Sequence, residues 1–177
     1  KNCSDLTDQL PEGRFMAKDE LPGKITSEGL KDNKNRSFKL EGKPDIVVQF
    51  EKEGYGIIDF KTTILKEDKS ESYKYQLEAY AQIFTNPGAT KTAPTPKLEP
   101  ITHMGILQFY PESIFQHGAD ECDLKMKTQY SPLKRNEKEF FEHITNLIDL
   151  LEKNEIPPLN EKCNDCSFIL KQKKLIF

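Results

Sequence analysis

The amino-acid sequence predicts a mixed α/β (α+β) fold in a chain of 177 residues. Two strand-like segments, 46–51 and 55–61, flank a Glu-Gly pair that is typical of a tight turn. Two later segments, 73–84 and 140–151, carry apolar residues at helical spacing. The length suits one domain with a core that needs no disulfide framework, so we interpret 1–177 as a single domain.

The composition excludes several classes of protein. Hydrophobic residues make up 36% of the chain and aromatic residues 10%, which is too much for a disordered protein. There is no run of about 18 apolar residues and no export signal, so we expect a cytoplasmic protein without a membrane partner. The net charge is −3, so binding to nucleic acid would require a bound cation or a local basic patch.

The N-terminal part of the chain contains the predicted hairpin. Residues 1–36 are punctuated by proline and glycine and are interpreted as irregular, with one short helix. Residues 37–42 alternate in polarity, which indicates a strand that enters a turn. The strands 46–51 and 55–61 then form the hairpin, and the charged segment 66–72 is interpreted as a loop.

A helix and two more strands follow. The helix over 73–84 ends at Asn86-Pro87-Gly88, a strong stop signal. Residues 89–100 contain three prolines and are interpreted as a long surface loop. Segments 101–110 and 122–130 are rich in alternating apolar residues and are predicted as strands.

The last predicted element is a second long helix. The charged run 134–139 is interpreted as its solvated start, and apolar residues at helical spacing continue to Leu151. Pro157-Pro158 is expected to end this helix. Residues 157–177 form a tail that contains a pair of cysteines and several lysines.

Two charged residues interrupt the strand predicted over 55–61. Asp59 and Lys61 are two positions apart, so they project from the same face of the strand. Asp45 begins the neighbouring strand, and the hairpin turn allows it to approach Asp59. Converging carboxylates suit Mg²⁺ or Mn²⁺ as ligands. With a lysine beside them, they predict metal-assisted hydrolysis of a phosphodiester bond.

The same residues have simpler interpretations. Asp59 and Lys61 can form an ordinary salt bridge on the strand face, and so short a motif also arises by chance. An unrelated α/β protein with such a chance match would gain no stability from divalent ions. The preceding Gly-x-Pro-Asp and the helix downstream favour the metal site.

Three motifs in order resemble the PD-(D/E)xK nuclease superfamily. They are LEGKPDIVV at 40–48, YGIIDFKTT at 55–63 and YQLEAYA at 75–81. Within the superfamily the chain is similar to the RecB-like branch, which includes CRISPR-associated RecB-like exonucleases. The resemblance covers residues 38–84 and implies a restriction-endonuclease-like core, a central mixed β-sheet flanked by helices.

The resemblance also implies roles for residues of the hairpin. Asp45, Asp59 and the backbone carbonyl of Phe60 would be ligands of Mg²⁺ or Mn²⁺. Lys61 would be the catalytic lysine.

A further motif of the branch, Gln-x-x-x-Tyr, matches Gln76 and Tyr80. It contacts substrate or orders the lysine, and residues four apart share one face of a helix. Simple amphipathic packing is the alternative, and it suits Tyr80 better than Gln76. The branch often has a further His or Glu upstream of the first Asp, for which the candidates here are Glu12, Glu20 and Glu28.

The cysteines raise the question of a second metal site. Many RecB-like nucleases hold an iron–sulfur cluster through one N-terminal and three C-terminal cysteines. Cys3, Cys163 and Cys166 lie in the corresponding regions, whereas Cys122 would have to replace the last one. Such a cluster needs four thiolates, and a structural Zn²⁺ site needs four ligands. We therefore interpret these cysteines as remnants or simple thiols in preference to cluster or zinc ligands.

The function that these observations predict is that of a divalent-metal-dependent nuclease. We expect it to hydrolyse single- or double-stranded DNA, in an exonuclease-like manner, in repair, recombination or defence. A larger nuclease or repair complex is a further partner consistent with this function. The alternative is a catalytically inactive module of the same fold that binds nucleic acid or protein, because a fold does not fix a function.

Overall fold

A computed structural model of the chain describes residues 2–17, 19–52, 54–63, 70–155, 163 and 166–168. Its contacts divide the chain into two compact units, Lys1–Glu142 and His143–Phe177, and each is described by itself. The central sheet and the candidate site belong to the first unit. The organisation of the chain as a single domain stays a prediction.

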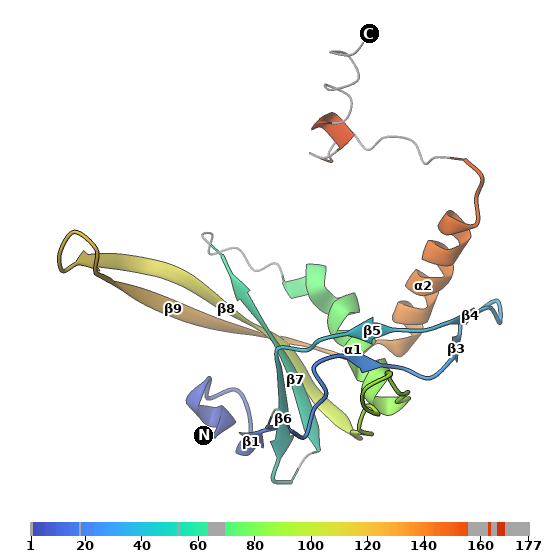
Figure 1. Cartoon of the computed structure of the whole chain (residues 1–177), viewed down its shortest axis with the longest axis horizontal. Coiled ribbons are helices and arrows are strands. Elements are labelled where there is room, and N and C mark those ends of the chain that lie inside the picture. The colour runs from blue at the N-terminus through green and yellow to red at the C-terminus, as the bar shows by residue number, and fades with distance from the viewer. Residues whose placement is uncertain are drawn as a thin grey trace. The chain divides into compact units, whose positions relative to one another are not determined.

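The first unit is built on a mixed five-stranded sheet (Figure 1). Its spatial order is β1 (Gly13–Phe15), β6 (Ile46–Phe50), β7 (Tyr55–Thr62), β8 (Ile101–Gln116) and β9 (Cys122–Leu133). β7 and β8 are parallel, and the other neighbouring strands are antiparallel. Two parallel neighbours require a crossover connection, which here contains α1 (Lys74–Thr85). The predicted fold class is confirmed.

The hairpin of β6 and β7 sets the geometry of the candidate site. Its register pairs Ile46 with Ile58 and Val48 with Gly56. Gly54 closes the turn with φ of 86°, a left-handed conformation that glycine adopts without strain. Continued by one residue, the same register brings Asp45 opposite Asp59, as the sequence predicts.

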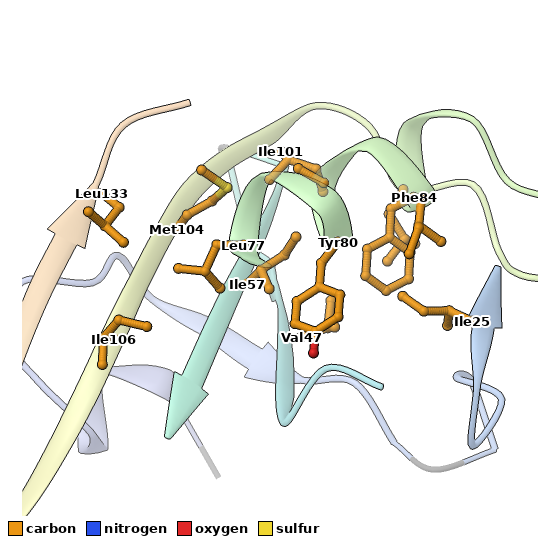
Figure 2. Close-up of a cluster of buried hydrophobic side chains, with 13 residues drawn as sticks. Ile25, Val47, Ile57, Leu77, Tyr80, Phe84, Ile101, Met104, Ile106 and Leu133 are labelled. Carbon is orange, nitrogen blue, oxygen red and sulfur yellow. The ribbon is translucent and has the colours of Figure 1, made fainter. Parts of the chain in front are cut away.

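The two faces of the sheet carry separate apolar clusters. Side chains of α1 pack on one face, where Leu77, Tyr80 and Phe84 meet Val47 and Ile57 (Figure 2). Neighbouring strand residues point to opposite faces, because the side-chain period of a strand is two. The second cluster therefore contains the next residue of each strand, together with apolar residues of the N-terminal segment: Val48, Ile58, Leu107, Cys3 and Leu10. Each buried aliphatic or aromatic side chain contributes about 1.5–3 kcal/mol.

The N-terminal segment over 1–36 is more ordered than the expectation of an irregular segment with one short helix. This segment contains the short helix η1 (Cys3–Asp5) and three short strands, β1, β2 (Ile25–Thr26) and β3 (Leu30–Lys31). β1 is an edge strand of the central sheet and pairs with β6. Segment 37–42 is not one strand but two, β4 (Ser37–Phe38) and β5 (Glu41–Gly42), which pair with β3 and β2. Strands of two or three residues are too short to show a period in the sequence.

The elements around α1 follow the prediction with two corrections. The helix ends at Thr85, as expected from the Asn-Pro-Gly stop that follows. Segment 89–100 is irregular, but it is not confined to the surface, because Thr95 and Leu98 are buried. Of the loop predicted over 66–72, residues 66–69 lie outside the described residues, and Ser70–Tyr73 forms the helix η2.

Strands β8 and β9 are longer than predicted, and helix α2 ends before the Pro-Pro pair that was expected to end it. β8 and β9 continue beyond the end of β7 as a two-stranded hairpin (Figure 1). Helix α2 (Glu137–Leu151) begins after Asn136, whose side-chain oxygen accepts the Glu139 N–H at 3.2 Å. It ends at Leu151, ahead of Pro157-Pro158, which lie outside the described residues. Among the described helices, none has the length and apolarity to cross a membrane.

Tyr130 of β9 is a buried ionisable group of the core. Its side chain packs in the cluster with Val48 and Leu107, and its ring occupies the space that a side chain at Gly105 would need. Burial raises the pKa of Tyr130 to about 12. The folded protein therefore keeps this phenol neutral at a pH at which an unfolded tyrosine is already ionised.

Tyr130→Phe is expected to remove one source of alkaline destabilisation. An unfolded tyrosine ionises near pH 10, so in the wild type the free energy of unfolding falls as the pH rises from about 10 to about 12. The variant should be close to the wild type at pH 8 and gain on it steadily above pH 10. Urea denaturation at several pH values measures this difference, and a difference that does not change with pH would contradict the prediction.

Candidate active site

Two carboxylates from neighbouring strands lie together at one end of the β6–β7 hairpin. Asp59 is in β7 and is 2% exposed, whereas Asp45 precedes β6 and is exposed. Asp45 Oδ2 accepts the backbone N–H of Phe60 at 2.9 Å, which holds its carboxylate beside β7. The expected approach of Asp45 to Asp59 therefore rests on the strand register and on this hydrogen bond.

Lys61 lies on the same face of β7 as Asp59. Its Nζ atom is 2.5 Å from Asp59 Oδ2, and 27% of its side chain is exposed. The ammonium also lies over the ring of Tyr73, at 4.7 Å from the ring centroid, in a cation–π contact. The Asp59–Lys61 salt bridge of the simpler interpretation is thus present. Asp59 is at the same time one member of the Asp45–Asp59 carboxylate pair.

The electrostatics of the pair follow from burial and proximity. Burial raises the pKa of the Asp59 carboxyl, and the nearby charge of Asp45 adds to this, so that together they outweigh Lys61. Burial alone would lower the pKa of Lys61, but its pairing with Asp59 outweighs burial and raises that pKa. Two carboxylates thus share one ammonium, an arrangement that a further cation would stabilise.

Helix α1 contributes a hydrogen-bonded chain to the same site. Gln76 Nε2 donates to Asp59 Oδ1 at 3.0 Å and to the Tyr80 hydroxyl oxygen at 3.1 Å. The Tyr80 hydroxyl in turn donates to the backbone carbonyl of Lys43 at 3.2 Å. The Tyr80 ring lies so close to Gly42 that a side chain there would overlap it. Gln76 and Tyr80 therefore share a face, as the helical spacing predicts, and they connect α1 to β7 and to the segment between β5 and β6.

The residues at this site fit a hard divalent cation. Asp59 Oδ2 is buried and accepts no well-directed hydrogen bond from the described residues, so a lone pair remains for a ligand. The main-chain N–H and C=O of a strand residue point to the same side, and the Phe60 N–H points towards Asp45. Two carboxylates and such a carbonyl are oxygen donors, which Mg²⁺ prefers, and Mg²⁺ commonly keeps several waters as well.

The upstream glutamates do not join this site. Glu20 binds Arg14 through two hydrogen bonds of 2.6 Å, and the hydrogen bond from Arg14 lowers the pKa of Glu20 to about 2. Glu12 and Glu28 are exposed. The part of the chain that the structure describes contains no group of three or more His, Cys, Asp or Glu residues placed to bind a metal.

The cysteines form no disulfide. Cys3 is buried, and its thiol donates to the carbonyl of Pro11 at 2.8 Å. Cys122 is exposed at the start of β9. Cys163 and Cys166 belong to the second unit, where the Cys166 N–H donates to Cys163 Sγ at 3.4 Å.

Sequence reasoning missed two parts of the site. Tyr73 packs against the apolar cluster, as its helical spacing predicts, but the sequence did not indicate that its ring also lies against the Lys61 ammonium. The Lys43 carbonyl, which accepts a hydrogen bond from the Tyr80 hydroxyl, could not be identified from the sequence either, because every residue has a backbone carbonyl. The Gly42-x-Pro-Asp segment was the nearest sequence indication of a close approach there.

The comparisons with known proteins identify the family. The family model of the PD-(D/E)XK nuclease superfamily matches residues 7–169, so the chain belongs to this superfamily. Its members are generally nucleases, and they typically use divalent metals such as Mg²⁺. Membership therefore indicates a nuclease-type function with nucleic acid as the substrate. Searches of curated proteins and of solved structures gave no significant match.

Proposed function

We propose that the protein is a divalent-metal-dependent DNA nuclease whose active site is formed by Asp45, Asp59, Lys61, Gln76 and Tyr80. Within the superfamily we assign it to the RecB-like branch, on the motifs at 40–48, 55–63 and 75–81. We further propose an exonuclease-like action in repair, recombination or defence. The observation that carries the proposal is the Asp45–Asp59 pair, in which the buried Asp59 Oδ2 atom has the Lys61 ammonium beside it but no well-directed hydrogen bond from the described residues.

Each residue has a distinct role in the proposed reaction. Asp45, Asp59 and the Phe60 carbonyl would hold Mg²⁺ or Mn²⁺, which when bound activates a water and stabilises charge on the phosphate. Lys61 places a second positive charge beside the carboxylates, where it can stabilise the negative charge that develops on the phosphate. Gln76 donates to Asp59 Oδ1 and so fixes the orientation in which Oδ2 faces the site.

One observation favours the second candidate, a catalytically inactive module that binds nucleic acid or protein. The described residues bring only two acidic side chains together here, and none of the upstream glutamates approaches them. A site with fewer ligands would bind metal weakly. The same experiment separates the two candidates, because an inactive module would not cleave DNA.

The decisive test compares DNA cleavage by the wild type and by Asp59→Asn, with single- and double-stranded substrates in Mg²⁺ or Mn²⁺. We expect the wild type to cleave and the variant to be slower by at least about 100-fold, because it loses a charged ligand. Asp120→Asn makes the same chemical change at an exposed position of the β8–β9 loop and should cleave as the wild type does. A circular substrate that resists cleavage would support the exonuclease-like action.

Thermal melting with and without metal completes this test. The wild type should melt at a higher temperature in Mg²⁺ or Mn²⁺, and Asp59→Asn should show no such shift. A metal-induced shift without cleavage would favour the inactive module. The absence of both cleavage and shift would contradict the metal site itself.

A further inference from the structure

A groove borders the proposed active site at the N-terminal end of β6. It has a volume of about 480 Å³ and lies between the segment that follows β1 and residues 43–47. Apolar side chains dominate its lining: Phe15, Met16, Leu21, Pro22, Pro44 and Ile46. Ligand sites in proteins are typically concave, mainly apolar and of this size.

Asp45 belongs both to the lining of the groove and to the proposed metal site. This residue lines the groove and its charge acts on Asp59, so the two sites have one residue in common. Lys43 lines the groove as well, and its side chain is in no ion pair with the described residues. A ligand in the groove would thus be surrounded mainly by apolar side chains, with Lys43 and Asp45 as the charged residues of the lining.

We propose that this groove is a subsite for one nucleobase, that of a nucleotide next to the phosphate to be cleaved. The inference rests on the proposed nuclease function and adds a substrate contact to it. A nucleobase is flat and largely apolar on its faces, and it stacks on aromatic and apolar side chains. The phosphate attached to the same nucleotide is negative, which suits Lys43 and a metal held by Asp45.

The proposal has a structural consequence for the substrate. A base within a duplex is stacked on both faces and cannot enter such a groove, whereas an unpaired or extruded base can. The base next to the cleaved bond should therefore be turned out of any duplex when it binds. Stacking on protein side chains is tolerant of sequence, so the groove is expected to accept all bases.

Two glycines allow a test that does not disturb the core. Gly23 lines the groove, and a Cβ added there would meet no atom within 4 Å. Gly118, in the loop between β8 and β9, has equally open surroundings and lies outside the groove. Gly23→Trp should fill the groove, and Gly118→Trp makes the same change elsewhere. Unchanged melting temperatures would show that both variants fold.

The first experiment places one abasic residue at successive positions of an oligonucleotide and measures kcat/KM for cleavage. In the wild type and in Gly118→Trp, a loss of about 10-fold or more is expected at one position beside the cleaved bond. Gly23→Trp should lose a similar factor on normal DNA and become insensitive to the abasic residue. Equal cleavage at every abasic position would overturn the base subsite and leave the nuclease intact.

The second experiment measures binding without cleavage. The affinity of Lys61→Ala for an oligodeoxyadenylate is compared with its affinity for an abasic strand of equal length. We expect the abasic strand to bind about 10-fold more weakly or worse, and adding Gly23→Trp to remove the difference. This result in a protein that cleaves no DNA would support the base subsite while the nuclease proposal fails. Equal affinities for the two strands would overturn the subsite in either case.

Discussion

Lys61→Ala is expected to lower the rate of DNA cleavage by about 10²–10³-fold, the effect typical of removing a group that stabilises charge in a transition state. The ammonium is 2.5 Å from Asp59 Oδ2, so it lies beside a carboxylate that would hold the metal. The proposed ligands remain in place, and metal binding should therefore survive. A rate within about tenfold of the wild type would remove Lys61 from the proposed machinery.

The same variant should change how the protein responds to metal. Without Lys61, the buried Asp59 and the neighbouring Asp45 have no ammonium beside them, so the metal-free protein loses stability, by up to about 3 kcal/mol. A bound divalent cation restores positive charge at that point. The metal-induced rise in melting temperature should then exceed that of the wild type, whereas Lys97→Ala, which alters an exposed ion pair, should leave it unchanged.

Glu78→Ala is expected to destabilise the protein by about 3–5 kcal/mol, because it breaks a buried ion pair and leaves other groups unsatisfied. Glu78 lies on α1 and its side chain is 3% exposed. It accepts hydrogen bonds from Arg135 at 2.8 and 3.2 Å, from the Asn136 backbone N–H at 3.1 Å and from Gln82 at 3.0 Å. These contacts connect α1 to the segment that precedes α2.

Urea denaturation of a double-mutant cycle checks this prediction. Glu78→Ala and Arg135→Ala should each be costly, and the double variant should be more stable than the sum of the two losses predicts. Glu142→Ala, at an exposed position of α2 that is in no ion pair with Arg135, serves as the matched control and should cost less than about 0.5 kcal/mol. Strictly additive losses would show that the two side chains do not act together.

The arrangement of the hairpin could be predicted from the sequence because every step is local. A period of two placed Asp59 and Lys61 on one face of a strand, and a Glu-Gly turn brought Asp45 back beside them. In the structure Ile46 pairs with Ile58, and Asp59 and Lys61 lie in contact on β7. The helix over 73–84 was equally predictable, because its apolar spacing and its Asn-Pro-Gly stop are both strong signals.

The N-terminal segment could not be predicted in this way. β1 has three residues, and it becomes a strand only because β6 offers it a partner for its backbone hydrogen bonds. The groove beside Asp45 has the same origin, since it forms between this segment and residues 43–47, about 30 positions further along the chain. Contacts of this kind depend on two segments that are distant in the sequence. The local pattern of either segment does not indicate which other segment it will contact.

The sequence by itself determined the family-like motifs, the hairpin and the candidate carboxylates, because these depend on neighbouring residues and on the periods of strands and helices. Only the tertiary structure decided that Gln76 of α1 donates a hydrogen bond to Asp59 of β7 and that the Lys61 ammonium lies over the Tyr73 ring. It also decided that Glu20 forms an ion pair with Arg14 and does not join the two carboxylates. These contacts depend on how α1 and the N-terminal segment pack on the sheet, which local periodicity does not specify.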